Sequence, residues 1–409
     1  MSTDLLLPPR RHDLDGYLAD GGYRAFAAVA ADPDRARAVL RTTTLTGLGG
    51  AHFPLARKIT AVLDRPAPRV VLCNAAEDEP GSGKDRALLA ANPHVVIEGA
   101  LIAAAVLAAA SVVLYAGQHT GNEIDSLAAA LDESSTRTML AGASVRIVAA
   151  PERYVAGEAT AAISVVDGGD GKPTGQPPYP SERGIGGHAT LVSNAETLAN
   201  LPRLIRAAER GGEPHWTRLC TVTGAVAAPG VYEIDPHVDT FATLIARAGG
   251  LTGSGQLKAF QPGGPSSRFL PAEAAGISMR DADIRAAGSQ PGCLAVRVLT
   301  TDNCIVEVCE DITAFFGREQ CGQCPPCRMK TQTYQRTFQQ IGSGKGSWNL
   351  LDKLAAVDDF VADMPRKCAL IDMPTPPVDS ARTLFPTDFA AHIEHGHCAA
   401  SLTPTTTAR

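Results

Sequence analysis

The heptapeptide CGQCPPC, residues 321–327, carries three thiols on one short loop. Thiolates are soft ligands, so Cys321, Cys324 and Cys327 can point at one soft metal centre. Clusters of the [4Fe–4S] type are held by four cysteines, and Cys368, about forty residues further on, is the best candidate for the fourth. We therefore predict a [4Fe–4S] cluster bound by these four residues.

A zinc site or a set of inert buried thiols is the alternative for this loop. Zinc usually takes its ligands from two separated pairs, whereas this sequence offers one triplet. Pro325 and Pro326 also stiffen the loop, which leaves it few uses other than metal binding. Both observations favour the cluster. Near the C-terminus His395, His397 and Cys398 could also bind metal, but their position beside an end expected to fray argues against it.

A glycine-rich stretch, TGLGGAHFPLARK, is the second candidate for ligand binding. Gly47, Gly49 and Gly50 let the backbone turn sharply and approach a ligand closely. Successive backbone amides can cradle a phosphate where such a loop leads into a helix, here expected over 56–63, and Lys58 adds a positive charge. The stretch is neither a P-loop nor a good dinucleotide fingerprint. A plain glycine-rich turn is the alternative.

Polar residues follow a short apolar strand expected over 69–73. Open α/β sheets bind ligands at the ends of their strands, and Asn74 can both donate and accept hydrogen bonds there. Glu77, Asp78 and Glu79 form an acidic cluster directly afterwards. For residues 84–86, Lys-Asp-Arg, a solvated charged loop is the favoured interpretation.

Three further stretches lie at places where a sheet of this kind would bind a ligand. Gly157 and Glu158 follow an expected strand at 145–149 and begin a helical pattern. Tyr179 lies in PPYP, a stiff loop that suits stacking on a flat ring, although a packing aromatic is the alternative. Helix capping explains Glu158 equally well, because a carboxylate is favoured at a helix N-terminus.

The stretch SNAETLANLP is the last of these and begins another expected helix. Ser193 or Asn194 would be its N-cap, and Thr197 falls in its first turn.

Composition excludes several classes of function. The chain has 409 residues, 44% hydrophobic and 20% charged, with a net charge of −6 and no basic block, which argues against nucleic acid as a partner. The N-terminus lacks the apolar core of a secretory signal, so reduced thiols in the cytoplasm are expected. The uncharged stretch 99–116 is too rich in alanine for a membrane span, and a buried helix over 92–109 followed by a strand is expected instead.

The expected fold class is α/β plus α+β plus α. A polar lead-in, 1–40, precedes an α/β domain, 41–212. Strand, turn, strand and helix patterns then indicate a small α+β unit over 213–300, of the β-grasp kind. Residues 301–395 are expected to be helical and 396–409 a disordered tail.

Taken together, these stretches resemble the NADH-binding flavoprotein (the 51 kDa-type or F subunit) of NADH:quinone oxidoreductase. The resemblance extends to the diaphorase subunits of NAD-linked hydrogenases and formate dehydrogenases. It covers about residues 40–395 and rests on GLGGAHFP, NAAEDEPGSGKDR, YVAGEATA, PPYP, SNAETLANLP and CGQCPPCR, in the family's order. It implies a Rossmann-like FMN domain, a β-grasp (SLBB-like) domain and a C-terminal helical bundle that carries the iron–sulfur cluster.

The resemblance also implies roles for individual residues. FMN would receive hydride from NADH, and electrons would leave singly through the cluster to a ferredoxin-like [2Fe–2S] or other iron–sulfur partner. Glu158 would be the catalytic residue beside the flavin and the NADH ribose, where its charge disfavours NADPH. The residues implied in cofactor binding are Gly47, Gly49, Gly50, Phe53, Lys58, Asn74, Glu77, Asp78, Glu79, Gly157, Glu158, Tyr179, Asn194 and Thr197.

The chain departs from the family at five positions. Leu48 replaces an arginine of the glycine loop, and His52 replaces a glycine. Ala76 replaces an aspartate, Gln176 a lysine, and Ile59 an aromatic residue. These departures motivate a second hypothesis beside the NADH-oxidising enzyme, an iron–sulfur relay or scaffold protein of a redox complex that no longer oxidises the nucleotide. A third hypothesis, a zinc-stapled binding module, fits the single cysteine triplet poorly.

Overall fold

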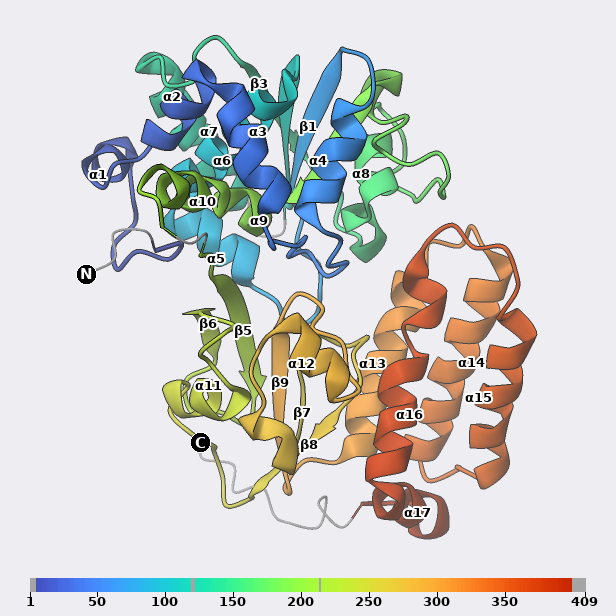
Figure 1. Cartoon of the computed structure of the whole chain (residues 1–409). Coiled ribbons are helices and arrows are strands. Elements are labelled where there is room, and N and C mark those ends of the chain that lie inside the picture. The colour runs from blue at the N-terminus through green and yellow to red at the C-terminus, as the bar shows by residue number, and fades with distance from the viewer. Residues whose placement is uncertain (1–4, 119–121, 213–214, 399–409) are drawn as a thin grey trace. The chain divides into compact units, whose positions relative to one another are not determined.

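The computed structural model describes residues 5–118, 122–212 and 215–398 (Figure 1). The chain divides into two compact units. Unit 1 comprises Met1–Asp78, Ser82–Cys220 and Val231–Asp235, and unit 2 comprises Glu79–Gly81, Thr221–Gly230 and Pro236–Arg409. Most of the expected disordered tail, residues 399–409, lies outside the described residues.

Unit 1 is built on a four-stranded parallel sheet. Its strands are β1 (Arg69–Ala75), β2 (Ser111–Ala116), β3 (Ser144–Ala149) and β4 (Ala189–Asn194), in the order β3-β2-β1-β4. Asn74 near the end of β1 is in register with Tyr115 of β2 and Asn194 of β4. The carboxyl ends of the strands therefore meet at one edge, which is where such sheets bind ligands.

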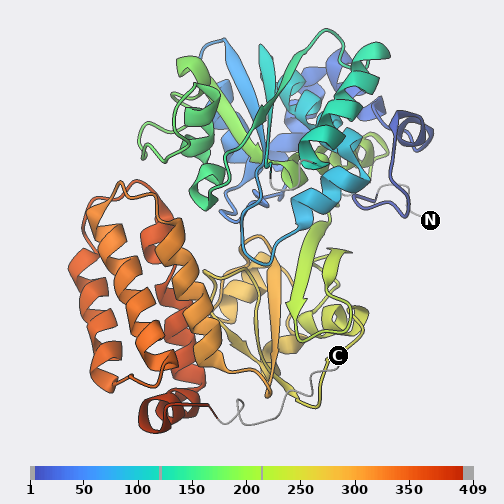
Figure 2. The same cartoon turned by 180° about the vertical axis from the view of Figure 1, so that it is seen from behind.

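Helices cover both faces of this sheet (Figure 1, Figure 2). Successive side chains of a strand point to opposite faces, so Val71 and Cys73 of β1 join one apolar core while Val70 and Leu72 join another. The larger core is formed with α1 (Leu14–Ala19), α2 (Arg24–Ala31), α3 (Pro33–Thr42), α4 (Leu55–Leu63), α5 (Lys84–Ala91), α6 (Pro93–Leu107), α7 (Asn122–Thr136), α9 (Ala195–Ala199) and α10 (Leu201–Glu209). The smaller core is formed with α8 (Ala159–Val166) and the short turn η2 (Ile185–Gly187).

Helix α6 is the buried helix that the sequence predicted. Of its residues all but Ala105 are buried, and its first turn follows Asn92. Among the described residues no single helix is long and apolar enough to cross a bilayer; α5 and α6 reach that length and composition only as a pair bent by 100°.

A mixed five-stranded sheet in the order β6-β5-β9-β7-β8 belongs mainly to unit 2. Its strands are β5 (Arg218–Gly224), β6 (Gly230–Ile234), β7 (Leu257–Gln261), β8 (Leu270–Pro271) and β9 (Ala295–Thr300), and the border between the units passes through β5 and β6. Strands β5 and β9 are parallel, whereas β7 is antiparallel to both β8 and β9. The helices α11 (Phe241–Arg247) and α12 (Asp281–Ala286) accompany this sheet.

The rest of unit 2 is helical. Its helices are α13 (Ile305–Glu319), α14 (Pro325–Gly342), α15 (Trp348–Val361), α16 (Thr375–Leu384) and α17 (Pro386–His395). Phe338 of α14 and Phe389 of α17 meet edge to face with ring centroids 6.2 Å apart, and both are buried. The motif CGQCPPC starts in the connection between α13 and α14, Cys324 is the N-cap of α14, and Cys327 lies in the first turn of that helix.

The expected mixture of a parallel α/β sheet, a second sheet and a run of helices is confirmed. The expected domain limits stay predictions, although the structure adds two facts about them. The lead-in carries the helices α1 and α2, whose Tyr17 and Phe26 are buried in the core of unit 1. Cys398, in the expected tail, is also buried.

Candidate functional site

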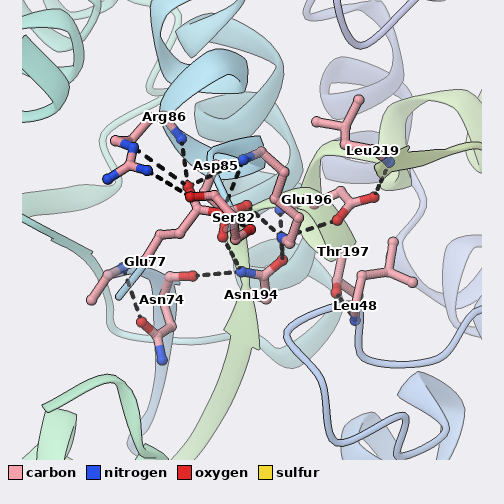
Figure 3. Close-up of polar contacts among 12 residues, drawn as sticks. Leu48, Asn74, Glu77, Ser82, Asp85, Arg86, Asn194, Glu196, Thr197 and Leu219 are labelled. Carbon is pink, nitrogen blue, oxygen red and sulfur yellow. Dashed lines mark hydrogen bonds and ion pairs between the residues drawn. The ribbon is translucent and has the colours of Figure 1, made fainter. Parts of the chain in front are cut away.

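Glu77 closes the N-terminal end of α5 at the strand-end edge of unit 1. Its carboxylate accepts hydrogen bonds from the backbone N–H groups of Lys84, Asp85 and Arg86 at 2.9, 3.1 and 3.2 Å, and from the Ser82 hydroxyl (Figure 3). These N–H groups have no partner inside the helix, and a negative charge is favoured there. Burial raises the pKa of Glu77, and the nearby Asp85 carboxylate raises it further. The positive charge of Lys84 lowers this pKa.

Lys84 and Asp85 form a buried ion-pair cluster with Glu196. The Lys84 Nζ lies 2.8 Å from Asp85 and 3.0 Å from Glu196, and each of the three side chains is at most 3% exposed. Burial alone would lower the pKa of Lys84, but the carboxylates of Asp85, Glu196 and Glu77 raise it by more than burial lowers it. The sequence-based interpretation of residues 84–86 as a solvated loop is wrong for Lys84 and Asp85, because their charges are paired inside unit 1.

Two asparagine amides join the ends of β1 and β4. Asn74 donates to the Gly157 carbonyl at 2.9 Å and accepts from the Ala76 N–H at 3.2 Å. Asn194 donates to the Asn74 carbonyl and to Asp85, and it accepts from Lys84 and from the Glu196 N–H (Figure 3). Asn194 is thus the N-cap of α9, as one of two alternatives predicted. Both side-chain amides are therefore engaged with protein groups. Together with the ends of β1 and β4 they form the base of the site, called the site floor below.

The glycine loop packs directly on this floor. The Leu48 N–H donates to the Thr197 hydroxyl at 2.8 Å. A Cβ on Gly49 would lie 3.1 Å from the Asn194 Cβ, closer than most side chains approach, so the loop backbone lies close to Asn194 at this position. Gly50 has φ +108°, which other residues rarely adopt. The loop is therefore held tightly against the ends of the strands.

Lys58 reaches under the same loop from α4. Its Nζ donates to the Val192 carbonyl at 3.1 Å and lies 3.5 Å from the position of a Cβ on Gly47. Burial lowers the pKa of Lys58. A cation beside the backbone of a glycine loop supplies the charge that a phosphate needs.

Two of the departures from the family have a visible structural consequence. Leu48 is fully buried in the larger core of unit 1, so its side chain offers no charge to a ligand. His52 has φ +51°, in the left-handed region that a glycine adopts without steric cost and that strains a residue with a Cβ. This explains why a glycine is expected at position 52.

Glu158 caps α8, yet only one of its oxygens does so. Oε2 accepts from the N–H groups of Thr160 and Ala161 at 2.9 and 3.1 Å and from the Thr160 hydroxyl. Within the described residues no hydrogen bond to Oε1 is present, so this oxygen can face a ligand. Asp78 lies near Tyr115. Burial raises the pKa of Tyr115, and the Asp78 carboxylate raises it further.

Phe53 and Tyr179 are exposed aromatic side chains. Phe53 is 42% exposed, with the Arg57 guanidinium 5.1 Å above its ring, and Tyr179 is 54% exposed. Neither ring is therefore buried in a core of the described residues, which favours stacking over the packing-aromatic alternative for Tyr179. Exposed rings of this kind can stack on a flat ligand at modest cost.

The residues around the sheet edge fit a phosphate-bearing flavin. The glycine loop offers backbone amides, Lys58 a cation, and Gly157 a position where a Cβ would already touch the Ala76 carbonyl at 3.4 Å. The Ser193 hydroxyl at the end of β4 is buried and makes no hydrogen bond within the described residues. A buried hydroxyl without a partner is costly and is a natural contact for a ligand.

Glu79 belongs to unit 2, unlike the other residues predicted to bind the nucleotide. A Cβ on Gly264 would lie 2.5 Å from its carboxylate, so Glu79 packs against a glycine of that unit. Its predicted role in cofactor binding stays a prediction.

The four predicted cluster cysteines come together in unit 2. The pKa of the Cys327 thiol is raised to about 12, first by burial and then by the thiols of Cys368, Cys324 and Cys321, which all lie close to it. Cys324 is the N-cap of α14, and Cys368 is the N-cap of the short turn Ala369–Asp372.

The spacing of these thiols suits a cluster better than a single ion. Two cysteines on one zinc ion hold their sulfur atoms about 3.8 Å apart. Among the described residues, these cysteines do not form a group whose ligand atoms all lie within 4.8 Å of one another. A cubane separates its cysteines more widely because irons and sulfides lie between them.

Gln323 and Lys367 belong to the cluster surroundings and were not predicted. The Gln323 amide donates to Cys321 Sγ at 3.5 Å, and Lys367 donates to the Gln323 carbonyl at 2.9 Å. Hydrogen bonds to cluster sulfurs tune the reduction potential. Gln323 lies inside the cysteine motif, so its position was a signal that could have been used, whereas Lys367 is far away in sequence.

Comparisons with known proteins match both units. The family described as "Nuo51 FMN-binding domain" matches residues 40–203, and the "NADH-ubiquinone oxidoreductase-F iron-sulfur binding region" matches residues 307–392. The NADH-quinone oxidoreductase F subunit of Mycobacterium bovis is 31% identical over 398 residues, covering 92% of this chain and 89% of the relative. The corresponding protein of Aquifex aeolicus is 32% identical over 83% of this chain and 82% of the relative.

A solved structure is similar over nearly the whole chain. It is an NAD⁺-reducing [NiFe]-hydrogenase in the H₂-reduced state, with a TM-score of 0.82 and 30% identity over 94% of this chain and 67% of that chain. The sequence and structure agree with the resemblance that the motifs carry. The chain therefore belongs to the family of NADH-quinone oxidoreductase F subunits.

Proposed function

We propose that this protein oxidises NADH with an FMN bound in unit 1 and passes single electrons to a [4Fe–4S] cluster bound in unit 2. One observation carries the proposal: a flavin-type strand-end site and four convergent cysteines occur in one chain, each within the region that matches the corresponding family. When bound, FMN supplies the conversion of a two-electron donor into one-electron steps, and the cluster accepts one electron at a time.

We infer that unit 1 is the Rossmann-like FMN domain of this family. Its parallel sheet and strand-end site support this. The mixed sheet of unit 2 would be the β-grasp (SLBB-like) domain, and α13–α17 the cluster-bearing bundle.

Within unit 1 the residues would hold FMN in two different ways. The backbone of Gly47, Gly49 and Gly50, with Lys58, would bind its phosphate side, because amides and a cation converge there. Asn74, Glu77, Asn194 and Thr197 would act by positioning, since protein groups already occupy their side-chain amides, the carboxylate and the Thr197 hydroxyl.

Glu158, Phe53 and Tyr179 would meet the nucleotide. Oε1 of Glu158 would accept a hydrogen bond from the NADH ribose, which makes Glu158 the proposed catalytic-site carboxylate. Its charge would repel the extra phosphate of NADPH. The exposed rings of Phe53 and Tyr179 would flank the adenine.

The acceptor would be a ferredoxin-like [2Fe–2S] or other iron–sulfur protein. The relatives are named as subunits, which supports a partner protein as acceptor. A cytoplasmic location is part of the proposal, because none of the ten cysteines, all within the described residues, forms a disulfide.

A nucleotide-inactive relay or scaffold protein is the second candidate. Leu48 and His52 favour it, because the first removes a charge from the glycine loop and the second adds bulk and strain there. In this case the cluster would be present without flavin.

Steady-state reduction of an artificial one-electron dye tests the proposal and its nucleotide preference. The FMN-loaded protein should reduce the dye with NADH and much more weakly with NADPH. Glu158→Gln should lower the ratio of kcat/KM with NADH to kcat/KM with NADPH, mainly by raising the value for NADPH. The amide oxygen can still cap α8, but the side chain no longer carries a charge that repels the extra phosphate. The exposed Glu152→Gln is the control and should keep the wild-type ratio. If the FMN-loaded protein reduces no dye with NADH, the proposal that it oxidises NADH is contradicted. If the purified protein binds the cluster but no flavin, the relay or scaffold function is favoured instead.

A further inference from the structure

A second group of metal-binding side chains lies outside the cluster loop. It consists of Cys304, the N-cap of α13, His392 on α17, and Cys398 beyond the end of α17. All three are buried, with 5%, 3% and 3% of their surfaces exposed. The Cys304 Sγ lies 3.1 Å from His392 Nε2, and the three ligand atoms all lie within 4.8 Å of one another.

These distances fit one ion. Zinc binds cysteine sulfur at about 2.3 Å and histidine nitrogen at about 2.0–2.1 Å, so two such ligands on a tetrahedral ion lie about 3.6 Å apart. The observed separations need only small side-chain adjustments to reach this geometry. Two thiolates and an imidazole form a soft set that suits zinc and not magnesium or calcium.

The group is separate from the predicted cluster. Cys304 precedes α13, whereas the loop that begins at Cys321 follows its other end. A helix of 15 residues is about 22 Å long. An ion bound by Cys304 therefore shares no ligand with the cluster, and the family match in this region gives no role to Cys304 or Cys398, which lie outside residues 307–392.

The position in the chain indicates a purpose. Cys304 begins the run of helices, and His392 and Cys398 end it, so an ion would join the first and last turns of the helical part. Closing so long a loop constrains the unfolded chain and stabilises the folded one.

We propose that Cys304, His392 and Cys398 bind a structural zinc ion and supply three of its four ligands. The ion would fasten the two ends of α13–α17, which carry the cluster between them. The alternatives are an unmetallated thiol–imidazole contact and a Cys304–Cys398 disulfide.

Metal analysis of the full chain, purified anaerobically with its iron–sulfur cluster, tests this proposal. We expect about one zinc ion per chain in addition to iron. Cys304→Ser and Cys398→Ser should each lose the zinc and keep the iron. Cys309→Ser, another buried cysteine on α13, is the matched control and should keep both metals.

Cys321→Ser excludes zinc that has entered an empty cluster site, because this variant should lose iron and keep zinc. If the serine variants fail to fold, zinc-edge X-ray absorption of the wild-type protein decides, since two sulfur ligands and one nitrogen ligand are required. Absence of zinc, zinc retained in both Cys304→Ser and Cys398→Ser, a zinc shell of oxygen alone, or a mass spectrum showing a Cys304–Cys398 disulfide would each overturn the proposal.

Discussion

At the scale of single residues, the ammonium of Lys84 lies between the carboxylates of Asp85 and Glu196, and none of the three reaches solvent. Removing one partner of such a buried group leaves uncompensated charge, which typically costs about 3–5 kcal/mol. Asn194 is hydrogen-bonded to both Lys84 and Asp85. Loss of the Lys84 charge should therefore also destabilise the site floor around Asn194.

Lys84→Met should lower the free energy of unfolding by about 3–5 kcal/mol and reduce FMN content. Urea denaturation followed by circular dichroism measures the first effect, and flavin absorbance the second. Lys172→Met removes an exposed ion pair with Asp170 and should cost less than about 1 kcal/mol. Equal effects of the two substitutions would refute the buried network.

His94 gives the protein a pH dependence of known sign. It is buried in unit 1, where its Nε2 lies 3.1 Å from Glu133, and burial lowers its pKa below 6.5 despite that carboxylate. The unfolded chain therefore takes up a proton first as the pH falls through 6.5, and stability is lost below that pH.

His94→Gln should remove part of this acid sensitivity. Melting temperatures of the wild type and the variant should be measured between about pH 5 and 8. The difference between them should be smaller at low pH than at neutral pH, because the wild type loses stability when the unfolded chain protonates His94 and the glutamine does not titrate. The exposed His188→Gln should behave as wild type throughout. A constant gap between wild type and His94→Gln at every pH would show that His94 does not titrate as described.

The residue scale is also where sequence reasoning was weakest. The cysteines were predictable because their spacing alone restricts them to metal chemistry. Lys84 was misread because its partner Glu196 is more than a hundred residues away, and burial of a charge depends on such distant pairing. The hydrogen bond of Lys367 to Gln323 was hidden for the same reason.

At the scale of elements, α6 and α9 cross at a glycine. A Cβ on Gly99 of α6 would lie 2.0 Å from the Leu198 carbonyl oxygen of α9, so the two helices can approach only because this position has no side chain. Helix α9 is capped by Asn194 and carries Thr197, whose hydroxyl accepts a hydrogen bond from the glycine loop. The crossing therefore positions part of the flavin site.

Gly99→Ala should destabilise the protein by about 1–3 kcal/mol through overpacking, even though alanine favours helices. It should also lower FMN content, because α9 must move. The matched control is Gly276→Ala, where a Cβ meets nothing within 4 Å, and it should change the urea midpoint little. An unchanged midpoint for Gly99→Ala would contradict the close crossing.

Most elements of this fold were predictable from local pattern. The strands at 69–75 and 111–116 and the helix at 93–107 have long apolar runs with clear ends. The strand β4 was missed because the polar SNAETLANLP indicated only a helix start. Neighbouring structure decides such short segments more than their own residues do.

At the scale of the whole molecule, the two cofactors are assigned to different units. The proposed flavin residues lie in unit 1, and the cluster cysteines lie in unit 2. Loss of one cofactor should therefore leave the binding of the other intact.

Cys321→Ser should remove most of the cluster iron and leave the FMN content unchanged. Iron and flavin assays of the purified variant measure both, and its NADH-dependent bleaching of flavin absorbance should persist. Cys309→Ser, which alters a buried thiol away from the loop, should retain both cofactors. Parallel loss of flavin and iron in Cys321→Ser would contradict independent binding.

Electron input from NADH through flavin to the cluster can be observed in anaerobic absorption and electron paramagnetic resonance spectra of the cofactor-loaded protein, recorded before and after NADH is added. We expect NADH to bleach the flavin bands and the signal of a reduced [4Fe–4S] cluster to grow with that bleaching. Iron–sulfur absorbance without flavin bands, unchanged by NADH, would contradict NADH oxidation and identify the chain as a relay or scaffold.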